Sequence, residues 1–123
     1  MSKNLEISVL FDYYGDMLTD KQRDVIDLYY NQDLSLAEIA EHEKISRQGV
    51  RDNIKRGELY LLELENALHM AKMSQALFGL LEEVEQRNGA IARLNEENKY
   101  SGEIREHTAE IAAKIHAFVK EYE

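Results

Sequence analysis

The sequence predicts an all-α protein, and three observations support that fold class. The 123 residues include no proline and only six glycines, so few residues interrupt a helix. Two capping-box signals for helix starts, Thr19 to Gln22 and Ser35 to Glu38, follow one another in the N-terminal half. Apolar residues in the C-terminal half recur in steps of three and four, which is the spacing of helices that pack along one seam.

The N-terminal part of the chain is expected to form two helices. An apolar segment from Leu5 to about Tyr14 predicts the first, and Gly15 is a suitable residue to end it. Thr19 then caps a second helix, which the polar residues at 31–33 end. The tyrosines of both segments lie among Leu and Ile, so we expect them to pack in the core rather than stack on bases.

The next two predicted helices have the arrangement of a helix-turn-helix motif. Ser35 caps a short third helix, and Ser46 caps a fourth. In the fourth, Val50 and Ile54 repeat at i and i+4 and form a face that packs on the helices before it. The second helix of such a motif is offered to a groove of DNA, and we expect the segment from Ser46 to Gly57 to be that helix.

The fourth predicted helix also carries an unusual concentration of positive charge. The whole chain has a net charge of −9, which opposes indiscriminate binding to nucleic acid, because such binding requires basic side chains that neutralise phosphates. Between Ser46 and Gly57, however, four basic side chains stand beside one acidic side chain, for a local charge of +3. The residues predicted to contact DNA are Gln48, Arg51 and Asp52 at base edges and Ser46, Arg47, Lys55 and Arg56 at phosphates.

The sequence predicts a head formed by residues 1–62 and a helical extension formed by residues 63–123. Turns are expected at Asn88–Gly89 and at Tyr100–Gly102, with a last helix after the second turn. The apolar seams of this extension pack either within one chain, as a hairpin, or between two chains. We favour a homodimer, because two heads on a twofold axis double the phosphate contacts that a single head makes.

Other classes of protein are not expected. The absence of cysteine excludes a disulfide scaffold and a thiolate metal site. No apolar run is long enough for a membrane span, and the start of the chain lacks the pattern of a signal peptide, so we expect a cytoplasmic protein that does not bind membranes. The four histidines are scattered and no nucleophile motif or phosphate loop occurs, so neither an enzyme nor a metal or cofactor site is predicted. The glutamates at 82–85 and 96–97 are interpreted as solvated helix faces.

Part of the chain resembles known DNA-binding proteins. Residues 18–56 read LTDKQRDVIDLYYNQDLSLAEIAEHEKISRQGVRDNIKR and resemble the fourth region of bacterial sigma factors, which binds the promoter −35 element. A closer resemblance, carried by FDYYGDMLT, LYY, SLAEIAE and SRQGVRDNIKR, is to the YlxM-like family of helix-turn-helix proteins, whose members are often encoded beside signal recognition particle genes. The resemblance implies a small bacterial cytoplasmic protein that binds DNA as a regulator, with a link to protein targeting.

Two hypotheses of function follow from these observations. In the first, the chain is a helix-turn-helix regulator that binds double-stranded DNA and dimerises through its C-terminal helices. In the second, the same helices dock on a protein or ribonucleoprotein, such as components of the signal recognition particle, without sequence-specific DNA binding. Binding to duplex DNA that weakens steeply with salt would distinguish the first from the second.

Overall fold

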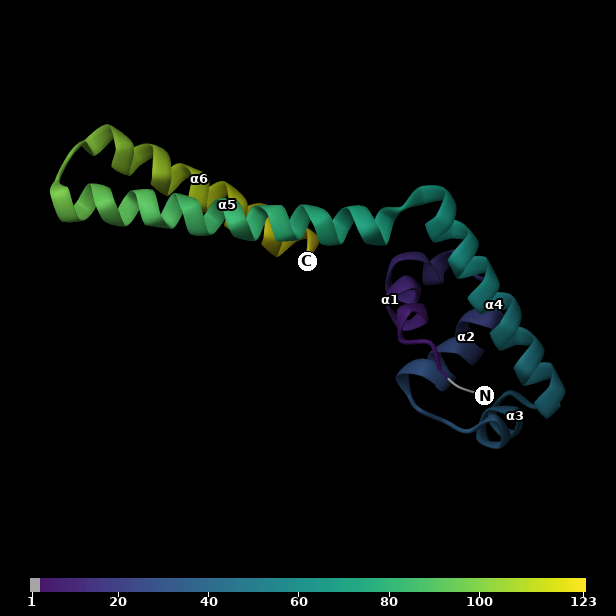
Figure 1. The fold of residues 1–123 in the computed structure, drawn as a ribbon. Helices are drawn as coiled ribbons and strands as arrows, with labels where there is room; N and C mark the ends of the chain where they lie inside the picture. The colour runs from purple at the N-terminus through teal and green to yellow at the C-terminus, as the bar shows by residue number, and fades with distance from the viewer. Residues whose placement is uncertain (1–2) are drawn as a thin grey trace. The chain divides into compact units, whose positions relative to one another are not determined.

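The computed structural model describes residues 3–123, so residues 1 and 2 of the predicted head lie outside the described part. The described residues form helices and contain no strand, which confirms the all-α fold class (Figure 1). The chain divides into two compact units, Met1–Lys72 and Met73–Glu123, which we call the head and the hairpin. The helices in chain order are α1 Leu5–Tyr14, α2 Asp20–Ile26, α3 Leu36–Glu43, α4 Arg47–Leu68, α5 Met70–Asn98 and α6 Gly102–Tyr122.

Both predicted capping boxes are present and complete. The Thr19 hydroxyl accepts a hydrogen bond from the backbone N–H of Gln22 at 3.2 Å, and the Gln22 side chain accepts one from the N–H of Thr19 at 3.3 Å. Ser35 and Glu38 make the same reciprocal pair, with both distances 3.1 Å. Each box satisfies two backbone donors that a helix start otherwise leaves unpaired, which fixes where α2 and α3 begin.

The second helix ends near the predicted residues but in an unpredicted form. After Ile26 the chain forms one π-helical turn, Asp27–Asn31, which is wider than an α-helical turn. Two successive tyrosines in this turn, Tyr29 and Tyr30, both pack against the core. The Tyr30 hydroxyl donates a hydrogen bond to Glu58 of α4 at 2.8 Å, and burial together with this bond raises the pKa of Tyr30 to about 12. Tyr29 and Tyr30 are therefore packing residues, as predicted, and Tyr14 is buried as well, whereas Tyr13 is 41% exposed and does not fit the prediction.

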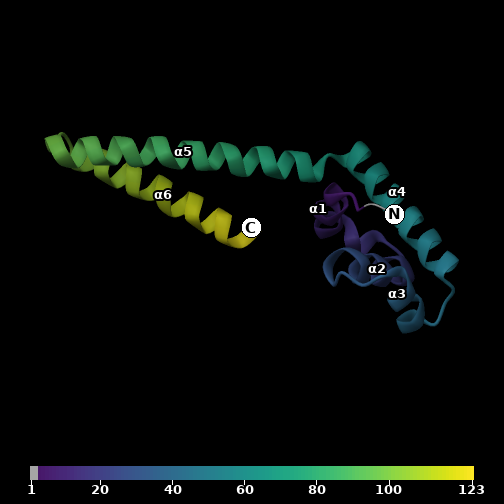
Figure 2. The same ribbon diagram turned by 60° about the horizontal axis from the view of Figure 1, so that its bottom comes forward.

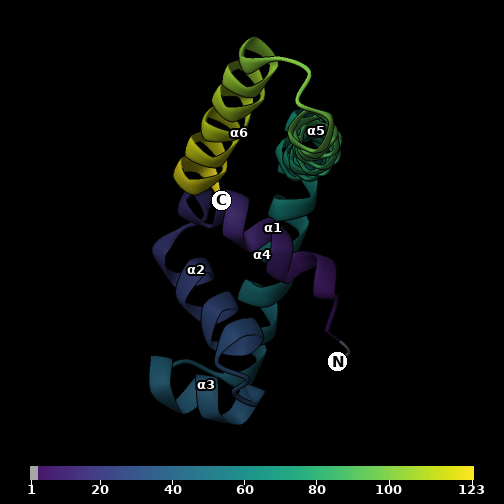
Figure 3. The ribbon, with the colours of Figure 1, turned by 90° about the vertical axis from the view of Figure 1, so that its left-hand side faces the viewer.

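Helix α4 contributes to both parts of the core of the head, and α1, α2 and α3 lie along one side of it (Figures 1 and 3). Its buried residues recur on one face of the helix. The cluster nearer the helix-turn-helix consists of Val25, Leu28, Tyr29, Ile39, Val50 and Ile54. The other cluster consists of Ile7, Leu10, Tyr14, Leu18, Ile26, Leu61 and Ala71.

Gly57 lies inside α4 rather than at its end. The sequence predicts a helical segment from Ser46 to Gly57 within a head of residues 1–62, whereas α4 is continuous to Leu68 and the compact N-terminal unit extends to Lys72. A Cβ atom at Gly57 would lie 2.2 Å from Cδ1 of the buried Ile26. The glycine therefore allows α2 and α4 to approach closely, and it does not interrupt the helix.

The turn between α3 and α4 takes the form of a helix-turn-helix turn with a lysine in its strained position. Lys44 has φ 57° and ψ 43°, the left-handed conformation in which glycine is usual. The backbone N–H groups of Lys44 and Ile45 both donate to the carbonyl of Ala40, the latter at 3.1 Å. Ile45 packs against the core beside Ala40. This packing keeps the turn closed even though its left-handed residue, Lys44, is not glycine.

A polar cluster ties the C-terminal end of α4 to α1. The buried Tyr14 donates a hydrogen bond through its hydroxyl to Glu65 at 2.6 Å and accepts one from the N–H of Met70 at 2.9 Å. The Glu65 carboxylate also accepts from the N–H groups of Ala71 and Lys72, so it caps the first turn of α5. Burial raises the pKa of Tyr14, and the bond from Tyr14 lowers the pKa of Glu65.

The hairpin contains two helices that run in opposite directions (Figures 1 and 2). The turn expected at Asn88–Gly89 is wrong, because α5 continues through both residues. Asn88 is only 7% exposed, and its side-chain amide donates to the carbonyl of Thr108 in α6 at 2.8 Å, so it joins two helices instead of ending one. The second expected turn is confirmed: α5 ends at Asn98, and Ser101 caps α6.

The substitution Gly57→Ala is expected to destabilise the head. Alanine favours a helix over glycine by about 1 kcal/mol, but the added methyl group would overlap the buried Ile26, and overpacking typically costs about 1 to 3 kcal/mol. We expect a lower free energy of unfolding in urea, followed by circular dichroism. Gly79→Ala is the matched control, because nothing lies within 4 Å of its added Cβ, and it should leave stability unchanged or raise it. A Gly57→Ala protein as stable as the wild type would contradict the close approach.

The substitution Lys44→Gly is expected to raise the free energy of unfolding by about 0.5 to 1 kcal/mol. It removes the cost of a left-handed non-glycine residue, about 1 to 2 kcal/mol, but adds backbone entropy to the unfolded chain, about 0.4 to 1 kcal/mol. Lys44→Ala keeps a Cβ atom and should give no such gain. Equal urea midpoints for both variants would show that the turn carries no strain at this residue.

Candidate nucleic-acid interface

The N-terminal half of α4 is oriented by a cap and by its buried face. Ser46 accepts a hydrogen bond on its hydroxyl from the N–H of Gly49 at 2.9 Å, which starts the helix where the sequence predicts. Val50 and Ile54 are both 0% exposed and pack in the cluster that also holds Ile39 of α3. Because these two residues lie inward, the residues between them are directed away from the core.

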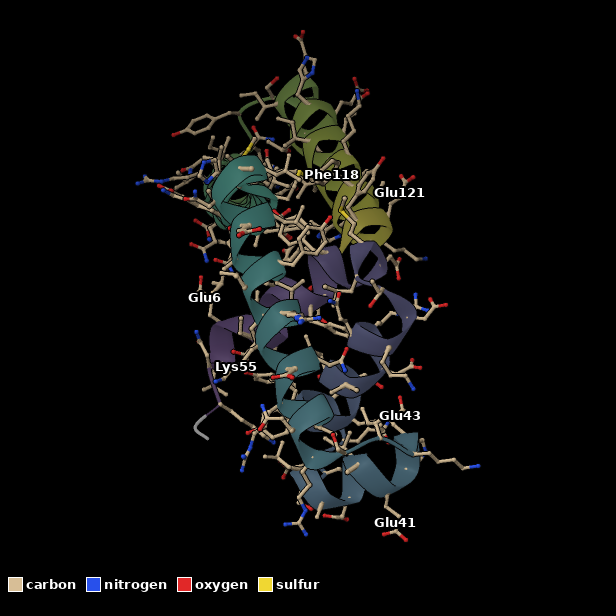
Figure 4. All side chains as sticks on the ribbon, turned by 90° about the vertical axis from the view of Figure 1, so that its right-hand side faces the viewer. Glu6, Glu41, Glu43, Lys55, Phe118 and Glu121 are labelled. Atoms are coloured by element: carbon tan, nitrogen blue, oxygen red, sulfur yellow. The ribbon has the colours of Figure 1, made fainter. Side chains whose placement is uncertain are left out.

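All of the predicted DNA-contacting residues lie on the exposed part of this helix or at its cap. Three of the basic residues, Arg47, Arg51 and Lys55, are four positions apart and therefore form one line along α4. Lys55 extends from the side of the helix into solvent (Figure 4). The residues classed as exposed are Ser46, Arg47, Gln48, Arg51, Asp52, Lys55 and Arg56.

The positive charge of this surface has no partner within residues 3–123. None of Arg47, Arg51, Lys55 and Arg56 forms an ion pair with a described residue. The basic residues that precede the motif, Lys3, Lys21 and Arg23, are paired with acidic residues, as with Arg23, whose guanidinium lies 3.3 Å from Asp20. The four cations are therefore free to neutralise the charge of a bound anion.

Gln48 and Asp52 form the one side-chain pair on this surface within the described residues. The Gln48 amide nitrogen donates to an Asp52 carboxylate oxygen at 3.0 Å. The pair is one helical turn apart, so each side chain restrains the other. Amide and carboxylate groups have the hydrogen-bonding pattern that reads the edges of adenine and cytosine in a major groove.

Three acidic residues of α3 lie close in sequence to the cationic helix, and two of them are occupied. Glu38 belongs to the capping box, where hydrogen bonds from the backbone and side chain of Ser35 lower its pKa. The Glu43 side chain is only 11% exposed and lies 3.7 Å from Lys21. Glu41 alone extends freely into solvent (Figure 4). Glu38 and Glu43 therefore have partners within the head, and Glu41 is the acidic residue of α3 beside the candidate interface that is left without one in the described chain.

Sequence reasoning did not include Lys44 in the candidate interface. Its side chain is exposed, and it lies in the turn two residues before the Ser46 cap. It adds a positive charge at the end of the helix that already carries Arg47 and Arg51. A basic residue in the turn ahead of a basic helix was the signal that could have identified it.

Two features are absent from the described residues, a cluster of metal-ligating side chains and a membrane-spanning helix. No group of three or more His, Cys, Asp or Glu side chains within residues 3–123 is placed to hold a metal ion. None of the helices of this part of the chain is long and apolar enough to cross a membrane. The exposed basic residues at the start of α4 therefore remain the candidate functional site of the described chain.

Residues 1–101 match the UPF0122 family, which is described as helix-turn-helix proteins like YlxM and p13. A UPF0122 protein of Clostridium perfringens is 41% identical over 115 residues, which cover 94% of this chain and 97% of that relative. One from Clostridium novyi is 36% identical over 85% of this chain and 90% of that relative.

Other UPF0122 relatives match over a shorter stretch, so the chain spans less than two thirds of their length. Those from two strains of Clostridium kluyveri are each 56% identical over 70 residues, which cover 57% of this chain and 63% of the relatives' own length. The family match and the fold agree, because the head contains the helix-turn-helix that the family description names. The chain belongs to the UPF0122 family of YlxM/p13-like helix-turn-helix proteins.

Proposed function

We propose that this protein binds double-stranded DNA through α4 and acts in the cytoplasm as a homodimeric regulator of transcription. The observation that carries the proposal is the exposed and unpaired cationic surface of α4, in a protein whose net charge is −9. Selection for solubility alone gives no reason to gather basic residues on one helix of an acidic protein. A helix that neutralises phosphates does give such a reason.

The residues have distinct roles in the proposed complex. Arg47, Lys55 and Arg56 neutralise phosphates, and Ser46 contacts a phosphate beside the helix start. Arg51 donates two hydrogen bonds to a guanine, and the Gln48–Asp52 pair contacts the neighbouring base pair. The three phosphates that these cations neutralise in each head give a slope of log K against log salt of about −3, at about −0.9 for each phosphate.

A homodimer follows from the small number of these contacts. One head offers only a few basic side chains, and the acidic remainder of the chain repels DNA. Two heads on a twofold axis bind two half-sites and double the slope with salt. The rival function, docking on a protein or a ribonucleoprotein such as a signal recognition particle component, is supported by family resemblance and is an outcome of the experiment below.

The double substitution Arg47→Ala and Arg51→Ala is expected to weaken DNA binding by at least about 30-fold, since it removes a phosphate contact and a base contact worth about 1 to 3 kcal/mol each. The measurement is fluorescence anisotropy of a labelled duplex library at several salt concentrations. Arg93→Ala with Lys120→Ala is the matched control, because it removes two exposed cations from the hairpin. The control should bind as the wild type does.

Two results would contradict DNA binding by α4. One is no binding of the wild type to any duplex at low salt. The other is equal affinity of the Arg47/Arg51 variant and the wild type. Binding to signal recognition particle RNA or protein, in place of duplex DNA, would support the rival function.

A further inference from the structure

The two helices of the hairpin meet along one regular line of residues. Contacts across the pair recur on α5 at intervals of seven and three, so they belong to a single helical face. They join Phe78 to Phe118, with ring centroids 6.2 Å apart, Glu85 to His116 at 2.7 Å, Asn88 to Thr108 at 2.8 Å and Asn95 to Ser101 at 2.7 Å. This inner face is largely polar in its second half.

A second line of residues on α5 is apolar and exposed. The inner line of α5 is completed by the half-buried Ser74, Leu81 and Ala92. Each member of the exposed line stands one position before a residue of the inner line, and the spacing is again four and three. Exposed fractions along this line range from 40% to 64%. The line consists of Met73, Leu77, Leu80, Val84, Ile91 and Leu94, with Arg87 at the remaining position.

Helix α6 extends this apolar surface. The inner line of α6 runs from the buried Thr108 through the half-buried Ala112 to the buried Ile115, and Ile111, which is 42% exposed, stands one position before Ala112. In an antiparallel pair of right-handed helices, residues one position before the contact line turn to the same side of the pair. Ile111 of α6 therefore lies on the same side of the hairpin as the exposed apolar line of α5, between the polar His107 and Lys114.

The opposite face of the hairpin is polar. Residues one position after the inner line of α5 include Gln75, Glu82, Gln86 and Glu96. Glu82 and Gln86 line a water-accessible depression together with His116 of α6. The exposed apolar side chains of α5 are thus confined to one side of the hairpin, and polar side chains occupy the opposite side.

We propose that the apolar face of the hairpin packs against the same face of a second copy of this chain, to form a four-helix bundle. This deepens the proposed function, on which its biological meaning rests, by naming the surface that forms the homodimer. A twofold interface requires a self-complementary patch, and the chain supplies the same heptad spacing on both sides of such an interface.

The size of the face fits a second copy. From Met73 to Leu94 the apolar line is about 32 Å long, at a rise of 1.5 Å per residue. Two helices side by side give a width of about 20 Å, so the dimer buries about 600 Å² on each copy and about 1,200 Å² in total. That total reaches the lower end of stable interfaces between proteins, about 1,200 to 2,000 Å².

Charge also favours a second copy over an unrelated partner. Arg87 is the one charged member of the apolar line on α5, and it forms no ion pair with a residue of the described chain. Glu83, one turn earlier, is exposed beside the same line. When two α5 helices pair antiparallel near their centres, Arg87 of each copy meets Glu83 of the other.

The test is the mass of the full chain in solution, measured without DNA by light scattering and sedimentation equilibrium. We expect twice the 14.3 kDa of one chain for the wild type at high micromolar concentration. Leu80→Asp with Ile91→Asp places two charges on the apolar face and should weaken self-association by at least about 100-fold. Gln75→Asp with Gln86→Asp adds the same charge to the polar face and should remain a dimer.

A monomeric wild type would overturn the inference, whether the apolar face then contacts the head, a different protein or solvent. A Leu80/Ile91 variant that stays dimeric would overturn it too, provided that circular dichroism shows unchanged helix content. The two proposals can fail separately. A monomer that still binds duplex DNA through Arg47 and Arg51 would refute the dimer interface and leave the DNA-binding proposal intact. A dimer that binds no duplex would refute the DNA-binding proposal and leave the dimer interface intact.

Discussion

The packing of one side of α4 against the rest of the head is the constraint on which the other features depend. Val50, Ile54 and Leu61 are fully buried along this side, and Gly57 between them allows α2 to approach. With that side inward, the cap at Ser46 sets the register of the helix, and the basic side chains are left outward. A single buried stripe thereby determines both the core of the head and the surface offered to a partner.

The separation of charge follows from the same arrangement. The chain is acidic as a whole, yet the acidic residues near α4 are largely used in capping and ion pairs, while the cations of α4 are unpaired within the described residues. Unpaired surface cations contribute little to stability, so their grouping on one helix points to binding. The hairpin shows a comparable separation between an apolar and a polar face, and the proposed dimer interface rests on that separation.

Features with local causes could be predicted from the sequence. Both capping boxes, the cap at Ser46 and the inward side of α4 depend on residues three or four positions apart, and all are present. Features with tertiary causes could not. Asn88 and Gly89 have the composition of a turn, but the contact of Asn88 with Thr108 keeps them helical. The π-helical turn depends on the packing of two tyrosines against α4, which no local pattern indicates. The spacing of apolar residues in α4 was enough to predict that the candidate site residues are exposed. The place of Lys44 beside them depended on the left-handed turn, which the sequence pattern did not indicate.

Nuclear magnetic resonance of the full chain during titration with duplex DNA tests the central claim most directly, because it locates the contacted residues without any substitution. If α4 binds the duplex, the backbone amides of residues 44–56 show the largest chemical-shift changes, and these changes shrink as salt is added. Amides of the hairpin, including those near Arg93 and Lys120, should change little. Changes centred on the hairpin, or spread evenly over the head without a maximum on α4, would contradict the assignment of α4 as the DNA-binding helix.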